Sequence, residues 1–318
     1  MKLNVKFKGY ALAALAAAAY GTNPAFAVPL YADGMDAVSV LLFRYLFCLP
    51  LLALMALLRG RSLRLRRVEI VPVAVLGILM ALSSLTLFQA YNYMNSGVAS
   101  TLLFIYPVLV AVMMSVFFHE RFRVTTALCL VLMGCGLVML MGGGGEGGMS
   151  LWGCVLVFVS SLTYALYLVM TNVNRTVAAV PTLTLLFWQF LVGGVMYAIF
   201  GGGGITVPGH SWGWLNLVAL ALLPSVISLG FTTEAIHCIG STPTAIFGAL
   251  EPVTAVVLSV CLLGQSLTPQ EVGGGLLIVA ATTLTVVADR VDGVLRRGRK
   301  KVAGRKGAGQ GGWWGWGG

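Results

Sequence analysis

The sequence predicts an all-α integral membrane protein in which ten transmembrane helices form two inverted five-helix repeats. Composition, the lengths of the apolar stretches and the placement of the charges support this prediction. Hydrophobic residues make up 58% of the 318 residues and charged residues only 9%, whereas a soluble domain has roughly 25% charged residues. One water-soluble core could not bury this much apolar surface, so we expect lipid to surround most of the chain.

Ten apolar stretches account for most of residues 9–288. A hydrocarbon core of about 30 Å requires about 20 residues of helix, and only helices or closed barrels satisfy the backbone in lipid. The stretches are much longer than the segments of about ten alternating residues that are typical of barrel strands. We therefore expect helical spans at 9–30, 36–58, 70–90, 97–118, 124–141, 151–171, 180–201, 214–235, 241–263 and 270–288.

Lysine and arginine residues are predicted to lie on one side of the membrane. They occur before the first span and after the second, fourth, sixth and tenth spans, whereas the opposite ends of the spans carry Asp33, Asp36, Glu146 and Glu271. Cytoplasmic loops are enriched in Lys and Arg, so we expect a multi-pass protein of the cytoplasmic (inner) cell membrane with both termini in the cytoplasm. Basic residues next to the spans favour membrane lipids over nucleic acid as partners.

The N-terminus has two interpretations. Lys-rich residues 2–8, an Ala/Leu run and Ala-Phe-Ala at 25–27 resemble a cleaved secretory signal. The alternative is a retained first helix. We favour retention because this span has a counterpart later in the chain.

The two halves of the chain are similar to each other. Tyr20 aligns with Tyr164, Arg44 with Trp188, and Tyr106 with Glu251. Because each half holds an odd number of spans, the second half enters the membrane upside down, which is typical of transporters with a site between the repeats. We expect a basic cytoplasmic N-terminus at 1–8, a first repeat at 9–141, a Gly-rich external loop at 142–150, a second repeat at 151–288, and a basic, Gly-rich, disordered cytoplasmic tail at 289–318.

Four groups of residues carry a resemblance to a known family. They are Tyr20-Gly21-Thr22-Asn23-Pro24, Phe43-Arg44-Tyr45, the run from Ala99 through Tyr106-Pro107 to His119-Glu120-Arg121, and Leu250-Glu251-Pro252-Val253. With them, the chain resembles the EamA-type transporters of the drug/metabolite transporter superfamily over residues 9–288. It departs from the family at Gly264-Gln265, where Gly-Glu is usual. The resemblance implies two five-helix repeats and a secondary exporter of small organic metabolites, such as amino acids or related compounds, or of drugs.

Two ionisable residues lie deep within expected spans. Such a group costs about 2.5–3.5 kcal/mol on insertion scales and is therefore a functional suspect. Glu251 shares a helix face with Thr244, Gly248, Ala255 and Ser259, where it either braces the kink at a proline or binds a proton or substrate. Arg44 is either a structural counter-ion or the site of an anionic substrate group. A direct Arg44–Glu251 pair remains an open alternative.

Polar-tipped residues at similar depth favour a cavity for an amphipathic or aromatic substrate, although ordinary helix packing is the alternative for each one. They are Tyr20, Asn23, Tyr106, Tyr164, Tyr167, Trp188 and Gln189.

We expect no enzyme activity, cofactor or metal. The glycine runs lack the lysine, strand and helix of a phosphate loop, the three histidines lack metal-ligand spacing, and the six cysteines form no CxxC pair. The sequence therefore favours a secondary transporter of a small molecule, with proton coupling through Glu251. The alternatives are a facilitative uptake carrier and a membrane-embedded ligand sensor without flux.

Overall fold

A computed structural model of the chain describes residues 2–90, 93, 102–119, 124–141, 150–202, 204–251, 253–254, 257, 269–270, 272–281 and 283–284. These residues form helices, and no strand occurs among them. The helices are α1 (Lys2–Tyr20), α2 (Asn23–Ala32), α3 (Ala37–Leu58), α4 (Arg67–Ala90), α6 (Tyr106–Phe118), α7 (Val124–Met141), α8 (Leu151–Val173), α9 (Arg175–Ala178), α10 (Thr182–Phe200), α11 (Ser211–Leu220), the π-helix η1 (Ala221–Ile227), α12 (Ser228–Ile239) and α13 (Ser241–Gly248).

Six helical segments among the described residues are long and apolar enough to cross a membrane: Val5–Ala32, Ala37–Leu58, Arg67–Ala90, Leu151–Val173, Thr182–Phe200 and Ser211–Ile239. Shorter apolar helices at Tyr106–Phe118, Val124–Met139 and Val272–Ala281 fall within three further predicted spans. Parts of the predicted spans at 97–118, 241–263 and 270–288 lie outside the described residues, as does the predicted tail. A multi-pass helical membrane protein is therefore confirmed, and the number of ten spans stays a prediction.

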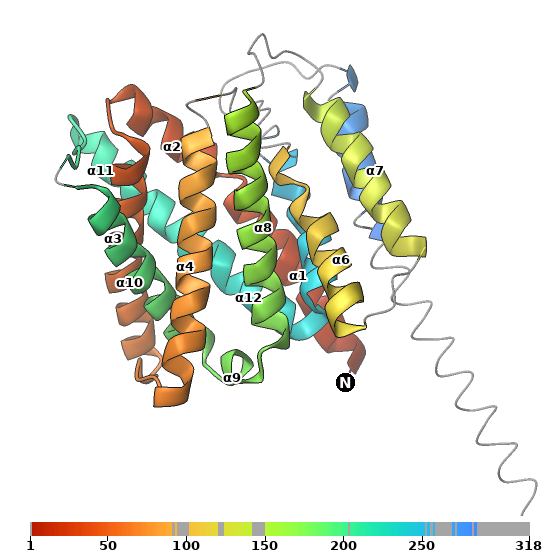
Figure 1. Cartoon of the computed structure of the whole chain (residues 1–318), viewed down its shortest axis with the longest axis horizontal. Helices are drawn as coiled ribbons and strands as arrows, with labels where there is room; N and C mark the ends of the chain where they lie inside the picture. Colours follow the sequence, from red (N-terminus) through yellow and green to blue (C-terminus); the bar gives the residue numbers. More distant parts are fainter. Residues whose placement is uncertain are drawn as a thin grey trace, which may run out of the picture.

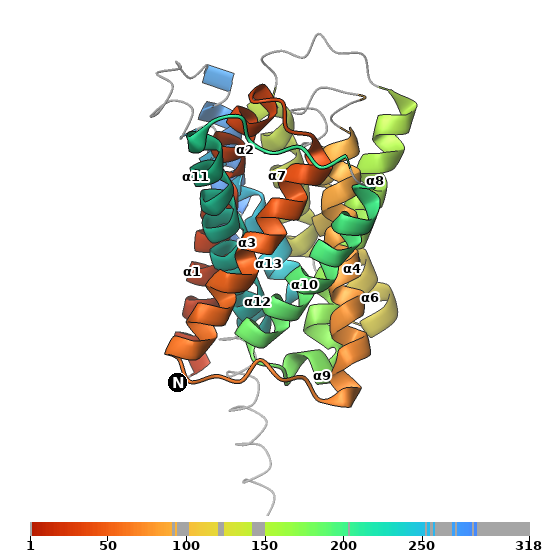
Figure 2. The ribbon, with the colours of Figure 1, turned by 90° about the vertical axis from the view of Figure 1, so that its left-hand side faces the viewer.

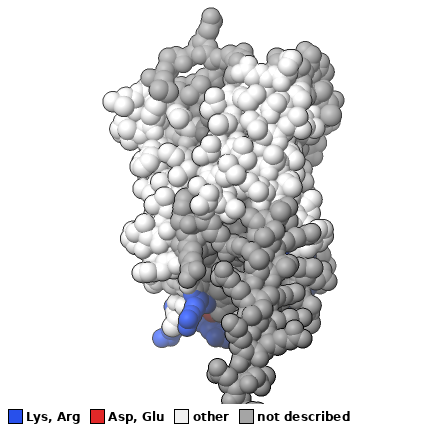
Figure 3. Space-filling view, turned by 90° about the vertical axis from the view of Figure 1, so that its right-hand side faces the viewer, with Lys and Arg blue, Asp and Glu red and all other residues white. Residues whose placement is uncertain are grey.

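The helices run roughly parallel to one another, vertically in the view of Figure 1. The N-terminus, the connection between α3 and α4, and the short helix α9 lie at one end, whereas α2 and α11 reach the other end (Figures 1 and 2). On the face shown in Figure 3, the Lys and Arg side chains of described residues gather at one end, and the remaining described surface is largely uncharged.

The outer surface of the helices is suited to lipid. Only 31% to 56% of each spanning segment's most apolar window is buried. Large apolar side chains project outward from several helices, including Leu57, Val124, Leu151 and Ile199, each more than two-thirds exposed. Water-soluble monomers rarely expose so much apolar surface, so lipid is the natural solvent for it.

The first predicted span is broken rather than continuous. Helix α1 ends at Tyr20, two residues form a turn, and α2 begins at Asn23. A β-carbon on Gly21 would lie 2.6 Å from the Glu251 carbonyl oxygen. Only glycine therefore allows the break in the first span to lie this close to the backbone at Glu251. Pro24 follows in the first turn of α2, where its missing N–H costs nothing.

The predicted span at 214–235 is also irregular, because η1 interrupts it around Pro224. Proline has no N–H to donate to the Leu220 carbonyl. The Ser225 hydroxyl donates to that carbonyl instead, over 2.8 Å. The predicted helical span therefore contains a π-helix at its centre, a feature often found at functional sites.

The two interrupted spans pack side by side. Helix α1 packs against α12, η1 and α13, while α2 packs against α11. The Ser228 hydroxyl at the start of α12 donates to the Ala16 carbonyl of α1 over 2.9 Å. Around this pair, α4 packs against α8 and α3 against α10. The breaks at Gly21 and Pro224 therefore belong to neighbouring helices.

Candidate functional site

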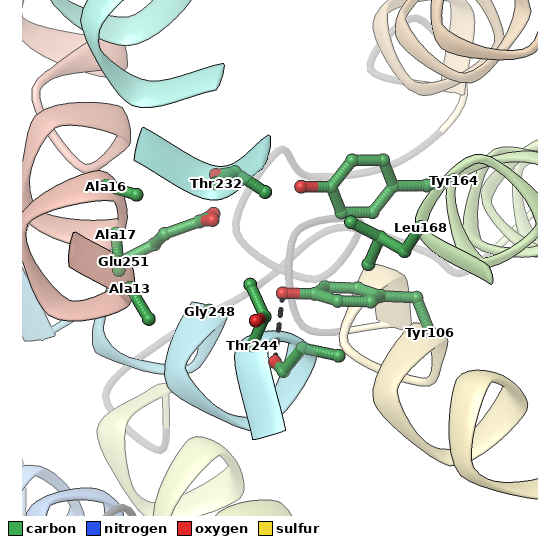
Figure 4. A pocket seen from close by; sticks show the side chains of 11 residues that line it. Ala13, Ala16, Ala17, Tyr106, Tyr164, Leu168, Thr232, Thr244, Gly248 and Glu251 are labelled. Carbon is green, nitrogen blue, oxygen red and sulfur yellow. Dashed lines mark hydrogen bonds between the residues drawn. The ribbon is translucent and has the colours of Figure 1, made fainter. Parts of the chain in front are cut away.

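A pocket lies in the interior between helices from both halves of the chain (Figure 4). It has room for about one water molecule and is partly open to its surroundings. Helices α1 and α6 of the first half supply four of its residues, and α8, α12, α13 and the residue Glu251 supply the others. The lining residues are Ala13, Ala16, Ala17, Tyr106, Tyr164, Leu168, Thr232, Thr244, Ala245, Gly248 and Glu251.

Glu251 points into this pocket (Figure 4). Within the described part of the chain, its carboxylate has no hydrogen-bond or ion-pair partner. An ionised carboxylate away from water is costly unless it is paired. Glu251 is therefore able to bind a proton or a cationic group that enters the pocket.

Tyr106 and Tyr164 stand opposite Glu251. Their rings meet edge to face with centroids 4.8 Å apart, and Figure 4 shows both hydroxyl groups directed into the pocket. The Tyr106 hydroxyl donates to the Ala245 carbonyl over 3.3 Å. A β-carbon on Gly248 would lie 1.7 Å from the Tyr106 hydroxyl oxygen, so the absence of a side chain at residue 248 makes room for this tyrosine.

Arg44 is buried, with 3% of its surface exposed, and its guanidinium donates to two neutral groups. Its Nε donates to the Ser225 hydroxyl over 2.6 Å and its Nη2 to the Pro224 carbonyl over 3.4 Å. The guanidinium carbon lies 5.9 Å from the centre of the Tyr20 ring, within the range of a cation–π interaction. Arg44 is thus held by the irregular helix η1 and by the end of α1.

Among the described residues, no ion pair joins Arg44 to Glu251. Tyr20 interacts electrostatically with both of them. This tyrosine is the last residue of α1, so it stands at the break in the first span. Beyond the break, the side-chain oxygen of Asn23 is buried without a partner among the described residues.

Tyr167 and Gln189 lie next to the pocket rather than in its wall. The Tyr167 ring stacks on Tyr164 at 6.0 Å with an interplanar angle of 9°. Its hydroxyl donates to the Gln189 side-chain oxygen over 3.4 Å, while the Gln189 nitrogen is buried without a partner in the described chain. These two residues can fix the orientation of Tyr164.

Trp188 does not line this pocket. Its indole nitrogen donates to the Leu63 carbonyl over 2.7 Å, in the connection between α3 and α4. Together with Thr184, whose hydroxyl donates to the Ser62 carbonyl over 3.1 Å, it holds that connection against α10. Trp188 therefore contributes to packing against a segment 125 residues away in sequence, and a cavity role for it stays a prediction.

Several lining residues went unnoticed in the sequence. Ala13, Ala16 and Ala17 are spaced as one helix face, but an alanine-rich run contains such a pattern by default. Thr232 lies on α12 with no distinctive neighbours. The Thr244, Gly248 and Glu251 face was visible from its spacing, whereas Ala255 and Ser259 lie outside the described residues.

A second polar cluster joins the far end of α2 to the segment before α11. Asp33 accepts hydrogen bonds from the backbone of Gly209 and His210, and one of its oxygens lies 2.6 Å from His210 Nδ1. The hydrogen bond with the His210 side chain lowers the pKa of the Asp33 carboxyl below its usual value. Among the described residues, no three His, Cys, Asp or Glu side chains come together as a metal site.

The sequence profile of the EamA-like transporter family matches the chain twice, at residues 7–142 and 151–287. The uncharacterized transporter YvbV of Bacillus subtilis is 28% identical over 243 residues, which cover 74% of this chain and 77% of YvbV. The uncharacterized transporter sll1319 of Synechocystis is 27% identical over 261 residues, or 77% of this chain and 78% of that protein.

One crystal structure of a protein with 20% sequence identity superposes with a TM-score of 0.71, covering 91% of this chain and 98% of the other. At this identity the likeness shows a shared fold. The family profile, by contrast, covers both halves of the sequence. The chain belongs to the EamA-like transporter family.

Proposed function

We propose that the protein is a secondary transporter of the cytoplasmic membrane that exports small organic metabolites, such as amino acids or related compounds, or drugs. Both termini would face the cytoplasm, where the basic residues concentrate. In this proposal the two halves are inverted five-helix repeats, and the substrate site lies between them. No cofactor takes part, and membrane lipid is the surrounding partner.

The pocket around Glu251 is the observation that carries this proposal. Its walls come from both segments matched by the family profile, so a relative movement of the halves would change access to it. Its only carboxylate lacks a partner among the described residues. A site between two repeats near the membrane midplane is the arrangement expected for alternating access.

Glu251 is the proposed coupling residue, and Arg44 its proposed charge partner. Tyr20 interacts electrostatically with both. Binding or release of a proton at Glu251 would alter the charge beside Tyr20 and, through it, beside Arg44, which bridges η1 and α1. These contacts join the breaks of two neighbouring helices, where a change of angle is least costly.

Flux in proteoliposomes tests this function. Purified protein is reconstituted and assayed with radiolabelled amino acids and organic cations, with and without an imposed pH gradient. We expect the imposed pH gradient to drive flux of at least one compound. Glu251→Gln should abolish this dependence of flux on the gradient while keeping expression and thermal stability. Glu69→Gln serves as the matched control, because Glu69 pairs with Arg66 outside the pocket.

Flux that is equal with and without the gradient would refute proton coupling and leave a facilitator. Ligand binding without flux for any compound would refute transport and favour a sensor. Gradient-driven flux that persists at the wild-type rate in Glu251→Gln would remove Glu251 from the mechanism.

A further inference from the structure

We propose that the Glu251 pocket binds the primary ammonium group of its substrate. This inference rests on the proposed function, since it names the chemical group that the transport site would take. The ligand class is an organic molecule ending in –NH₃⁺, with the Glu251 carboxylate as counter-ion. Hydroxyl oxygens of the pocket wall would accept the remaining hydrogen bonds.

The charge of the pocket favours a cation. Of the 11 side chains drawn in Figure 4, Glu251 is the only carboxylate, and none is Lys, Arg or His. Arg44 is engaged elsewhere, by Ser225 and Pro224. An anionic group entering here would meet a like charge, whereas a cation would supply the partner that Glu251 lacks among the described residues.

Two hydroxyl groups of the wall, those of Tyr106 and Thr244, are fixed as acceptors. Tyr106 commits its proton to the Ala245 carbonyl over 3.3 Å, and Thr244 commits its proton to the Gly240 carbonyl over 2.7 Å. A hydroxyl whose proton is used in this way can offer only lone pairs to a ligand. With the carboxylate, the pocket thus presents three groups that accept, and a primary ammonium is the common cation with three protons to donate.

The orientation of the two rings separates primary from quaternary ammonium. A cage for a quaternary ammonium presents the faces of aromatic rings to the cation. Here Tyr106 and Tyr164 enter the pocket end-on, with their hydroxyl groups leading toward Glu251 and Gly248 (Figure 4). A trimethylated cation has no N–H to donate, so it would leave the carboxylate and both fixed acceptors without partners.

The opposite wall is built from small residues. Ala13, Ala16 and Ala17 of α1 face the tyrosines, and Gly248 leaves space beside the Tyr106 hydroxyl. The space between these residues has room for about one water-sized group, which is the size of an ammonium group. Methyl groups on the ligand nitrogen would press against the hydroxyl groups or against this alanine surface.

A methylation series tests the proposal by binding alone, without flux. Butylamine, N,N-dimethylbutylamine and butyltrimethylammonium are titrated against the purified full-length protein at one pH, with calorimetry and thermal unfolding as readouts. Hydrogen bonds that involve charged groups discriminate by about tenfold or more. We expect butylamine to bind at least about tenfold more tightly than butyltrimethylammonium, with the dimethyl compound between them.

Two variants locate the effect. Glu251→Gln should abolish detectable binding of butylamine. Tyr106→Phe removes one acceptor but keeps the ring, and should narrow the preference for the primary amine several-fold. Tyr197→Phe is the matched control, because its hydroxyl donates to the Ala81 carbonyl outside the pocket and its loss should leave the preference unchanged.

Equal or tighter binding of butyltrimethylammonium would overturn the proposal, and so would butylamine binding that survives Glu251→Gln. Binding of none of the three compounds, by a protein that still shows gradient-driven flux of another substrate, would also overturn it and leave Glu251 with a proton-only role. That last outcome spares the proposed transport function, whereas the absence of all flux would refute the function independently.

Discussion

Removing the Ser225 hydroxyl should destabilise the protein far more than removing the Ser228 hydroxyl, although the two serines are three residues apart and almost fully buried. Ser225 accepts from Arg44 Nε over 2.6 Å and donates to the Leu220 carbonyl over 2.8 Å. Ser228 donates to the Ala16 carbonyl alone. Only Ser225→Ala therefore removes a hydrogen bond of a buried charge as well as one to a backbone carbonyl.

The expected magnitudes follow from these contacts. A hydrogen bond to a charged group contributes about 1.5–3 kcal/mol and a neutral one about 0.5–1.5 kcal/mol. Ser225→Ala should thus lower the free energy of unfolding by about 2–4.5 kcal/mol. Ser228→Ala should cost about 0.5–1.5 kcal/mol, in line with the average of about 0.6 kcal/mol for hydrogen bonds between membrane helices.

Reversible unfolding in mixed micelles, with Arg44→Met as the second arm of a double-mutant cycle, measures both numbers and their coupling. Once Arg44 is absent, Ser225→Ala should cost only the Leu220 contact, so the coupling energy between residues 44 and 225 should be about 1.5–3 kcal/mol. If Ser225→Ala is no more destabilising than Ser228→Ala, or the coupling is near zero, then η1 does not hold Arg44 as described.

Two further predictions concern the break in the first span and the far end of that span. Gly21→Ala places a methyl group within 2.6 Å of the Glu251 carbonyl oxygen. The overpacking should cost about 1–3 kcal/mol of stability and slow flux, whereas wild-type stability together with wild-type flux would contradict the close approach. Asp33→Asn should destabilise the protein at neutral pH, because the pKa of the Asp33 carboxyl is lowered in the folded protein. Such a carboxyl stabilises the fold above its unfolded pKa of about 4. This contribution is lost as the pH falls through the folded pKa. The difference in melting temperature between wild type and Asp33→Asn should therefore disappear in acid, and a difference that grows in acid would refute the assignment.

The regular helices could be predicted because their signal is local. Long uninterrupted apolar runs correspond to α3, α4, α8 and α10 to within a few residues. The position of Glu251 beside Thr244 and Gly248 was also readable, because helical spacing alone puts them on one face. Composition and helical periodicity were enough to predict the position of a helix wherever its backbone was regular.

What the sequence did not reveal depends on distant contacts. The partners of Arg44 are 180 and 181 residues away, and they exist only because Pro224 widens a helix that its composition predicts as regular. The depth of Trp188 suggested a cavity residue, and its hydrogen bond to the Leu63 carbonyl could not be read from that depth. Side-chain direction at the middle of an apolar helix is set by such neighbours and not by the periodicity.

The central claim is that the pocket between the two halves opens alternately to the two sides of the membrane. Its most direct test is Thr232→Cys in a protein whose six native cysteines are replaced by alanine, with labelling in oriented vesicles by a membrane-impermeant thiol reagent added on one side or the other. Alternating access predicts labelling from both sides, with substrate and an imposed pH gradient shifting the balance between them. Labelling from one side only under every condition, or from neither, would contradict the account.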